Sequence, residues 1–153
     1  MSNASIYALD LTQRPPRSPR VRLGGYVGLA RMLDKGRSTI VGKNGEYHYD
    51  CPADQHVLNF IGLDANALKA ELAAGRNDGE ILEWINANAK NKRAPWEIEQ
   101  WSNYMERRTP DSDEETLGFF AGMVGKLSKT REDLKTWMDV LDADDYVTFG
   151  GKL

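Results

Sequence analysis

The stretch from Leu23 to Val41 most constrains the fold, because it reads as one long amphipathic helix with two charges on its apolar face. At about 100° per residue, one side of this helix collects apolar residues. These are Leu23, Tyr26, Val27, Ala30, Leu33 and Val41. Asp34 and Arg37 fall among them. Charges in that position either pair with each other at i,i+3 spacing inside the fold or line a polar site for a ligand.

Length and composition fit a single globular domain. The chain has 153 residues, of which 41% are hydrophobic and 28% charged, so it can bury a core without the help of disulfides or metal ions. Its net charge of −3 argues against nucleic-acid binding. The single cysteine, Cys51, allows no internal disulfide and fits a reducing compartment. No segment has the apolar run of a signal peptide or a membrane span, so a cytoplasmic protein without membrane contact is predicted.

Residues 1–22 are predicted to form an extended N-terminal arm. Pro15, Pro16 and Pro19 forbid a helix there and favour a polyproline-like path. The arm concentrates basic side chains while the rest of the chain is acidic; its arginines are Arg14, Arg17, Arg20 and Arg22. We expect the arm to lie across its own acidic body through arginine–carboxylate pairs. Two sharper interpretations are an arm that binds nucleic acid and an arm that forms one wall of an anion site.

Start and stop signals divide residues 23–142 into about seven helices, followed by a tail over residues 143–153. After the first helix, the later ones are predicted to open, with a cap or a first-turn proline, at Pro52, Asp64, Asn77, Pro95, Ser112 and Thr130. A hairpin that pairs residues 40–41 with residues 46–50 is the alternative for the first connection. The elements together predict an all-α single domain, a compact irregular bundle of about seven helices under the extended arm.

Several runs of residues, most of them in the N-terminal half, carry a family resemblance. They are Asp10-Leu11-Thr12, Pro15-Pro16-Arg17-Ser18-Pro19-Arg20, Leu23-Gly24-Gly25-Tyr26, Ala30 to Arg37, Tyr47-His48, Cys51-Pro52-x-Asp54, and Asp78 with Glu80 to Trp84. With these runs the chain resembles an uncharacterised bacterial family, domain of unknown function 5069. The resemblance is good over residues 9–90 and looser beyond them. It implies a small bacterial cytoplasmic domain and assigns no catalytic role to any residue.

The start of the predicted first helix is a candidate anion site. Gly24 and Gly25 would place free backbone N–H groups and the positive end of the helix dipole there, with Arg20 and Arg22 just before them. The alternative is that these glycines only permit close helix packing. A similar small-residue ridge for close packing is expected on a later helix, at Gly118, Gly122 and Gly125.

The polar part of the first helix is the second candidate. Asp34 and Arg37 lie on its core side, with Arg31 and Lys35 on the flank. A carboxylate beside cations keeps a low pKa and is a poor general base, so as a site this group would hold a polar or anionic ligand. The structural alternative is a buried ion-pair network that organises the helices.

Metal-ligating residue types gather within residues 48–56, which contain His48, Asp50, Cys51, Asp54 and His56. Their spacing matches no established zinc pattern, and Asp54 fits the start of a helix equally well. No metal and no cofactor are therefore predicted, and Cys51 is expected to be a small buried residue.

No motif in the chain assigns a reaction, so two classes of function stay open. In the first, a pocket between the arm and the first helix binds a small polar or anionic metabolite. Its predicted residues are Arg17, Arg20, Arg22, Gly24, Gly25, Asp34, Arg37 and Tyr47. In the second, the domain is a protein-interaction or structural module that uses exposed aromatic anchors: Trp96, Tyr104, Tyr146 and Phe149. Convergence of Arg20, Arg37 and Tyr47 in one polar pocket would favour the first class.

Overall fold

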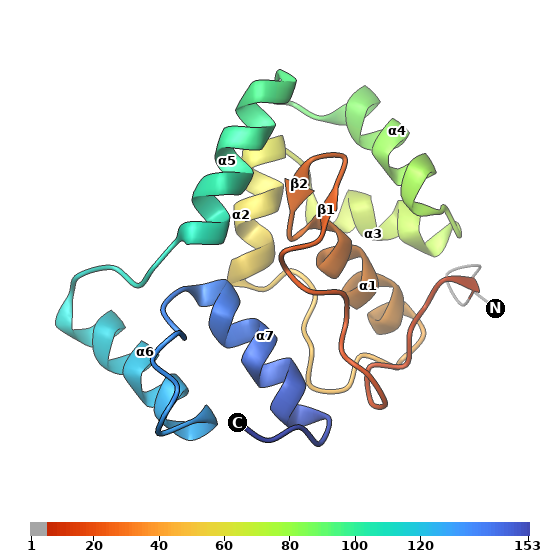
Figure 1. The fold of residues 1–153 in the computed structure, drawn as a ribbon. Coiled ribbons are helices and arrows are strands. Elements are labelled where there is room, and N and C mark those ends of the chain that lie inside the picture. Colours follow the sequence, from red (N-terminus) through yellow and green to blue (C-terminus); the bar gives the residue numbers. More distant parts are fainter. Residues whose placement is uncertain (1–5) are drawn as a thin grey trace.

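A computed structural model describes residues 6–153, in which a short β-hairpin precedes seven helices (Figure 1). The strands are β1 (Arg22–Leu23) and β2 (Tyr26–Val27). The helices are α1 (Leu29–Ile40), α2 (Pro52–Ile61), α3 (Ala65–Ala73), α4 (Asp78–Asn88), α5 (Pro95–Arg107), α6 (Glu114–Leu127) and α7 (Trp137–Thr148). The predicted compact helical bundle is thereby confirmed. Within the described residues, no helix combines the length and apolar character that a membrane crossing requires.

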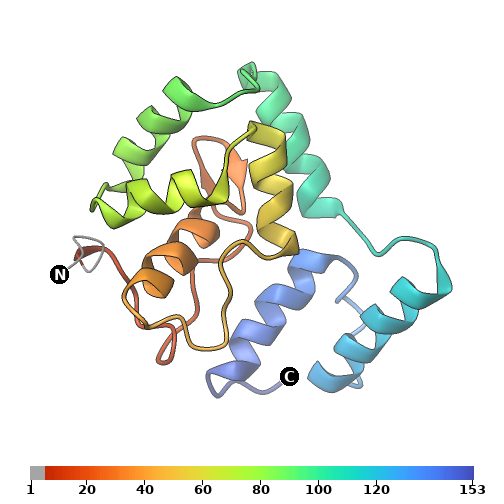
Figure 2. The ribbon, with the colours of Figure 1, turned by 180° about the vertical axis from the view of Figure 1, so that it is seen from behind.

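Helix α1 lies at the centre of the fold, between α7 and the group formed by α2 to α5, as the two opposite views show (Figures 1 and 2). Leu29, Met32 and Leu33 on this helix are fully buried, and with side chains of α2, α3 and α4 they form the main hydrophobic core. Gly36 allows α3 to approach, because a Cβ at this position would lie 2.6 Å from Cδ1 of Leu72. The central position explains why even the charged residues of α1 are buried.

The first helix is shorter than predicted, because residues 22–27 form the β-hairpin instead. Gly24 and Gly25 both have positive φ angles, 59° and 86°, which is the backbone that a tight two-residue hairpin turn needs. The hairpin is antiparallel, with Leu23 opposite Tyr26. The prediction that Gly24 and Gly25 begin a helix is wrong, and they offer no helix N-terminus to an anion. Their Gly-Gly sequence between apolar residues is itself a hairpin signal.

Four of the predicted helix starts are confirmed, and two are wrong. Helices α2 and α5 begin with Pro52 and Pro95, Asp64 caps α3, and Asn77 forms a capping box with Glu80 at α4. At α6 the capping residue is Asp113 rather than Ser112. Helix α7 begins after the capping box of Thr136 with Asp139, six residues later than Thr130.

Two further predictions fail in the connections and at the C-terminus. The segment between α1 and α2 contains no strand, so the alternative hairpin over residues 40–50 is wrong. Helix α7 continues to Thr148, so the predicted tail over residues 143–153 is helical in its first half. In the segment before α7, the Ser128 hydroxyl accepts the N–H groups of Thr130 and Arg131, and Asp133 accepts from the Arg131 side chain instead of joining a capping box with Thr130.

Helix α6 lies at the edge of the molecule and packs along α7 (Figures 1 and 2). Phe120 anchors it through an edge-to-face contact with Trp137, at 5.0 Å between ring centroids. A Cβ placed on Gly118, Gly122 or Gly125 would meet no described atom within 4 Å. The prediction that these glycines form a closely packed ridge is therefore wrong within the described residues.

Candidate functional site

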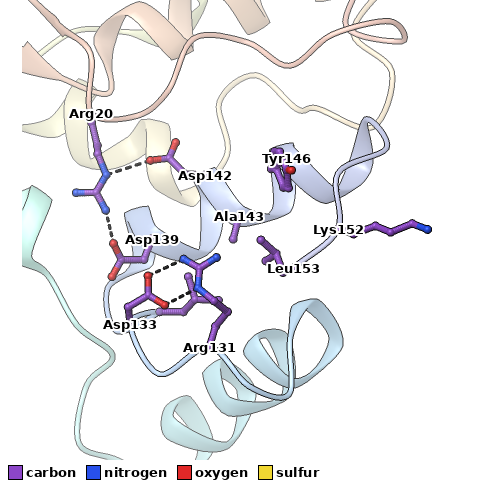
Figure 3. A pocket seen from close by; sticks show the side chains of 10 residues that line it. Arg20, Arg131, Asp133, Asp139, Asp142, Ala143, Tyr146, Lys152 and Leu153 are labelled. Atoms are coloured by element: carbon purple, nitrogen blue, oxygen red, sulfur yellow. Dashed lines mark hydrogen bonds and ion pairs between the residues drawn. The ribbon is translucent and has the colours of Figure 1, made fainter.

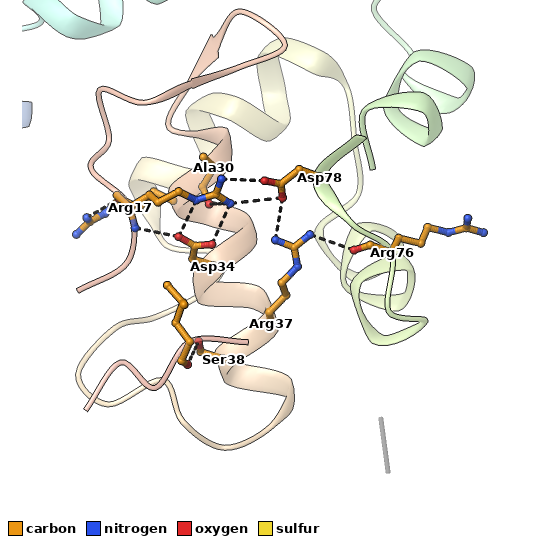
Figure 4. A network of polar contacts seen from close by, with 9 residues as sticks. Arg17, Ala30, Asp34, Arg37, Ser38, Arg76 and Asp78 are labelled. Atoms are coloured by element: carbon orange, nitrogen blue, oxygen red, sulfur yellow. Dashed lines mark hydrogen bonds and ion pairs between the residues drawn. The ribbon is translucent and has the colours of Figure 1, made fainter. Parts of the chain in front are cut away.

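The N-terminal arm is fixed to the bundle by Arg17, whose side chain lies between α1 and α4 (Figure 4). Its backbone N–H and its Nε both donate to Oδ2 of Asp34, at 2.9 and 3.0 Å. Its Nη1 donates to Oδ2 of Asp78, at 2.8 Å. The predicted docking of the arm through arginine–carboxylate pairs is confirmed.

Asp78, the first residue of α4, joins Arg17 to Arg37 (Figure 4). Nη1 of Arg37 donates to Oδ1 of Asp78 at 2.9 Å, and its Nη2 donates to the carbonyl of Arg76 at 3.0 Å. Burial acts to raise the pKa of Asp78, but hydrogen bonds from the two arginines outweigh it and hold that pKa below its ordinary value. The four charges form one partly buried network with no net charge, in which Asp34 and Arg37 are the buried members.

Asp34 and Arg37 are both buried in this network, as the sequence predicted, but they do not pair with each other. Asp34 faces the arm and Arg37 faces α4, so each takes its partner from a different segment. The predicted i,i+3 pair is wrong for that reason. The partners lie 17 and 41 residues away along the chain, and helical periodicity gives no information on contacts at such separations.

A cavity of about 520 Å³ lies beside the network, between the arm, α1 and the start of α4. We call it the arm cavity; it is lined by Tyr7, Leu9, Arg17, Asp34, Arg37, Asn77, Asp78 and Gly79. The ring of Tyr7 lies over the guanidinium of Arg37, with 5.6 Å between the guanidinium carbon and the ring centroid. The arm cavity thus combines an aromatic face, two arginines and a helix N-terminus.

The arm cavity contains several hydrogen-bond donors that have no acceptor among the described residues. Nε of Arg37 is buried and has no hydrogen-bond acceptor among residues 6–153. The capping box uses the side-chain oxygen of Asn77 and leaves its amide nitrogen without an acceptor in that same range. The N–H groups of Asp78 and Gly79, in the first turn of α4, lack the intrahelical acceptor that later residues have. Both carboxylates of the cavity already accept from arginines.

Three of the predicted site residues meet in the arm cavity, namely Arg17, Asp34 and Arg37. Arg20 instead pairs with Asp139 and Asp142 of α7, beside an open hollow of about 550 Å³ (Figure 3). Three more of the predicted positions, Arg22, Gly24 and Gly25, belong to the hairpin, where Arg22 pairs with Glu106 of α5.

Tyr47, the last predicted site residue, does not line the arm cavity. Its hydroxyl donates to Asp145 of α7 at 2.7 Å. Burial, followed by the hydrogen bond to Asp145, raises the pKa of this hydroxyl. Arg20, Arg37 and Tyr47 therefore do not converge in one pocket.

Residues 48–56 do not assemble a metal site. Asp54 forms an ion pair with Lys35, with 2.9 Å between Oδ1 and Nζ, and Lys35 also donates to Sγ of Cys51 at 3.2 Å. In the described part of the chain, no three His, Cys, Asp or Glu side chains come together in a way that could hold a metal ion. Cys51 is half-buried at the N-cap of α2.

Sequence reasoning missed five residues of the arm cavity: Tyr7, Leu9, Asn77, Asp78 and Gly79. The capping box of Asn77 was the one available signal, and it located the start of α4 correctly. It could not reveal that this helix start faces the arm, because that contact joins segments about 60 residues apart and depends on the tertiary fold.

The fold and the network define a small helical domain whose arm is held on the bundle by arginine–carboxylate pairs. The chain belongs to the family described as Domain of unknown function (DUF5069), whose profile matches residues 13–147. The matched range includes Arg17, Asp34, Arg37 and Asp78. The family resemblance drawn from the sequence is thereby confirmed. No curated protein matches the chain.

Proposed function

We propose that this protein binds a small molecule through a carboxylate or phosphate group held in the arm cavity. The hydrogen-bonding groups of the cavity carry the proposal: both carboxylates already accept from arginines, whereas Nε of Arg37, the amide of Asn77 and the first N–H groups of α4 have no acceptor among residues 6–153. An unpaired buried N–H such as Nε of Arg37 costs free energy unless an acceptor reaches it. An oxyanion supplies several acceptor oxygens at once, and a helix N-terminus favours its negative charge.

The size and walls of the arm cavity suit a metabolite larger than an inorganic ion. Its volume of about 520 Å³ lies within the range of small-molecule pockets. Tyr7 is 41% exposed, so its ring can also contact the body of a ligand. The two carboxylates hold the arginines in place, and the network positions donors without adding net charge.

The proposal is tested by calorimetric titration with inorganic phosphate and with malonate, against chloride at matched ionic strength. Asn77→Asp keeps the oxygen that caps α4 but replaces the amide donor by a negative charge. We expect it to weaken binding at least about tenfold, or ~1.4 kcal/mol. The matched control Asn66→Asp adds the same charge at an exposed position near the start of α3 and should bind like the wild type. Equal binding by Asn77→Asp, or a response no larger than that to chloride, would contradict the proposal.

A protein-interaction module is the second candidate, supported by two exposed aromatic residues on α5. Trp96 is 67% exposed and Tyr104 is 64% exposed, and they lie eight residues apart, within about a quarter-turn of each other on one side of the helix. Aromatic side chains of this kind commonly anchor interfaces. Light scattering at increasing concentration tests self-association: loss of it in the double variant Trp96→Ser with Tyr104→Ser would favour this candidate, and a monomer throughout would count against self-association.

We further infer that the protein works in the bacterial cytoplasm. The family resemblance implies a bacterial source, and a single half-buried cysteine fits a reducing compartment. Fractionation of the source cells with an antibody against the protein tests this location.

A further inference from the structure

A second cavity, separate from the arm cavity, lies where α1, α2, α5, α6 and α7 meet. Its volume is about 370 Å³, and it shares no lining residue with the arm cavity. We call it the core cavity. Most of its wall is apolar and includes the side chains of Val57, Met105, Phe119, Met123 and Leu141. This composition favours the apolar body of a small ligand.

Helix α1 contributes two cations to the wall, and both are neutralised. Arg31 makes two hydrogen bonds to the carboxylate of Asp145, at 2.7 and 3.2 Å. Lys35 pairs with Asp54, and both side chains of this pair are about 95% buried. These groups give the cavity a polar side without an unmatched charge.

Arg108 supplies the charge that is not matched. It lines the core cavity just after α5 and forms no ion pair within residues 6–153. Burial and then the charge of Arg108 lower the pKa of His56, another wall residue, which favours the neutral form of its imidazole. A half-buried guanidinium beside an apolar cavity favours an anionic partner.

Trp137 adds a second group that lacks an acceptor. Its indole Nε1 is buried and has no hydrogen-bond partner in the described part of the chain. Trp137 is also adjacent to Arg108, because its backbone N–H donates to the carbonyl of Arg108 at 3.2 Å. Within residues 6–153, a guanidinium without an ion pair and a buried indole N–H without an acceptor thus belong to neighbouring residues in the wall of one largely apolar cavity.

We infer that the core cavity is a second binding site, for a monocarboxylate whose body is apolar, such as a medium-chain or aryl-substituted acid. The carboxylate meets Arg108 and the indole N–H of Trp137, and the apolar body lies against the methionines and Phe119. Phe119 is 65% exposed, so α6 forms the outer wall of the site. This inference does not depend on the function of the arm cavity.

The test is a calorimetric titration of the full chain with octanoate, compared with octan-1-ol and octylammonium, which share its apolar body. We expect saturable binding with octanoate preferred at least tenfold over both comparison ligands. The indole N–H signal of Trp137, assigned by its loss in Trp137→Phe, should shift with the same saturation curve. Equal affinity for octanoate and octylammonium, or an indole signal that does not respond, would overturn the inference.

Two matched variants locate the head group. Arg108→Gln should lose at least tenfold in octanoate affinity and leave octan-1-ol binding unchanged. Arg107→Gln removes the same charge at the neighbouring exposed position and should bind octanoate like the wild type. Circular dichroism of both variants confirms that the fold is kept. Equal octanoate affinity in the two variants would overturn the assignment of Arg108, and Asn77→Asp should not affect octanoate binding because it alters the arm cavity only.

Discussion

Replacing Arg17 by alanine should destabilise the fold more than replacing Arg37, although Arg37 is the more deeply buried. The exposed fractions of the two side chains are 34% and 3%. The difference lies in what each substitution leaves behind. Among residues 6–153, every hydrogen bond to the Asp34 carboxylate comes from Arg17, whereas Asp78 is shared by Arg17 and Arg37.

The expected magnitudes follow from the carboxylate that remains. In Arg17→Ala, Asp34 keeps one backbone N–H but loses its cation while 4% exposed, and an uncompensated buried charge of this kind costs about 3–5 kcal/mol. In Arg37→Ala, Asp78 keeps Arg17 and is 31% exposed to water, so the loss is confined to packing and hydrogen bonds, about 1–3 kcal/mol. We therefore expect a difference of about 2 kcal/mol between the variants.

Urea denaturation at pH 7 measures both values on the same scale. The double variant Arg17→Ala with Asp34→Asn removes the orphaned charge and should recover at least half of the loss caused by Arg17→Ala. An Arg37→Ala variant that is as unstable as Arg17→Ala, or a double variant that recovers nothing, would refute the reasoning.

Three further predictions concern other parts of the fold. The pKa of Asp78 is lowered on folding, so its contribution to stability is present above about pH 4 and is lost as the pH falls through the folded-state value. Asp78→Asn should therefore weaken the pH dependence of the unfolding free energy between about pH 5 and about pH 3. An unchanged pH dependence in this variant would count against the prediction. Gly24→Ala should lower stability by about 1–3 kcal/mol, because φ is +59° and the new Cβ would lie 2.6 Å from Leu82, whereas an unchanged melting temperature would contradict the hairpin turn. Gly122→Ala should raise the melting temperature, by the equivalent of about 0.5–1 kcal/mol, since open space surrounds this helical position. A lowered melting temperature would contradict this prediction, because it would mean that another group packs against α6 at Gly122.

Local signals predicted the fold well wherever the capping chemistry was unambiguous. Pro52, Asp64, Asn77 and Pro95 all begin or cap the predicted helices. The errors arose where two local readings competed. Gly24-Gly25 fits both a helix start and a hairpin turn, and the spacing of the flanking apolar residues did not separate them. Thr130 and Thr136 are each followed by Asp three residues later, and only Thr136 caps a helix.

The candidate site was predictable only in part, because its partners come from distant segments. Helical periodicity correctly placed Asp34 and Arg37 on a buried face. It could not supply Asp78, which approaches through the tertiary packing of α4, and so a pair between the two residues themselves stayed open as one alternative. The core cavity was equally impossible to predict from local sequence patterns, since Arg108 and Trp137 become neighbours through a backbone hydrogen bond between segments 29 residues apart.

The central claim, that the arm cavity receives an oxyanion, is tested most directly by the nuclear magnetic resonance signal of the Arg37 Nε–H group. Arg37→Lys assigns this signal by removing it. Addition of phosphate or malonate should shift it, together with the backbone amide signal of Gly79, along one saturating curve that chloride at equal ionic strength does not reproduce. An Arg37 Nε–H signal that stays unchanged, or that moves in proportion to salt concentration with all three anions, would contradict the claim.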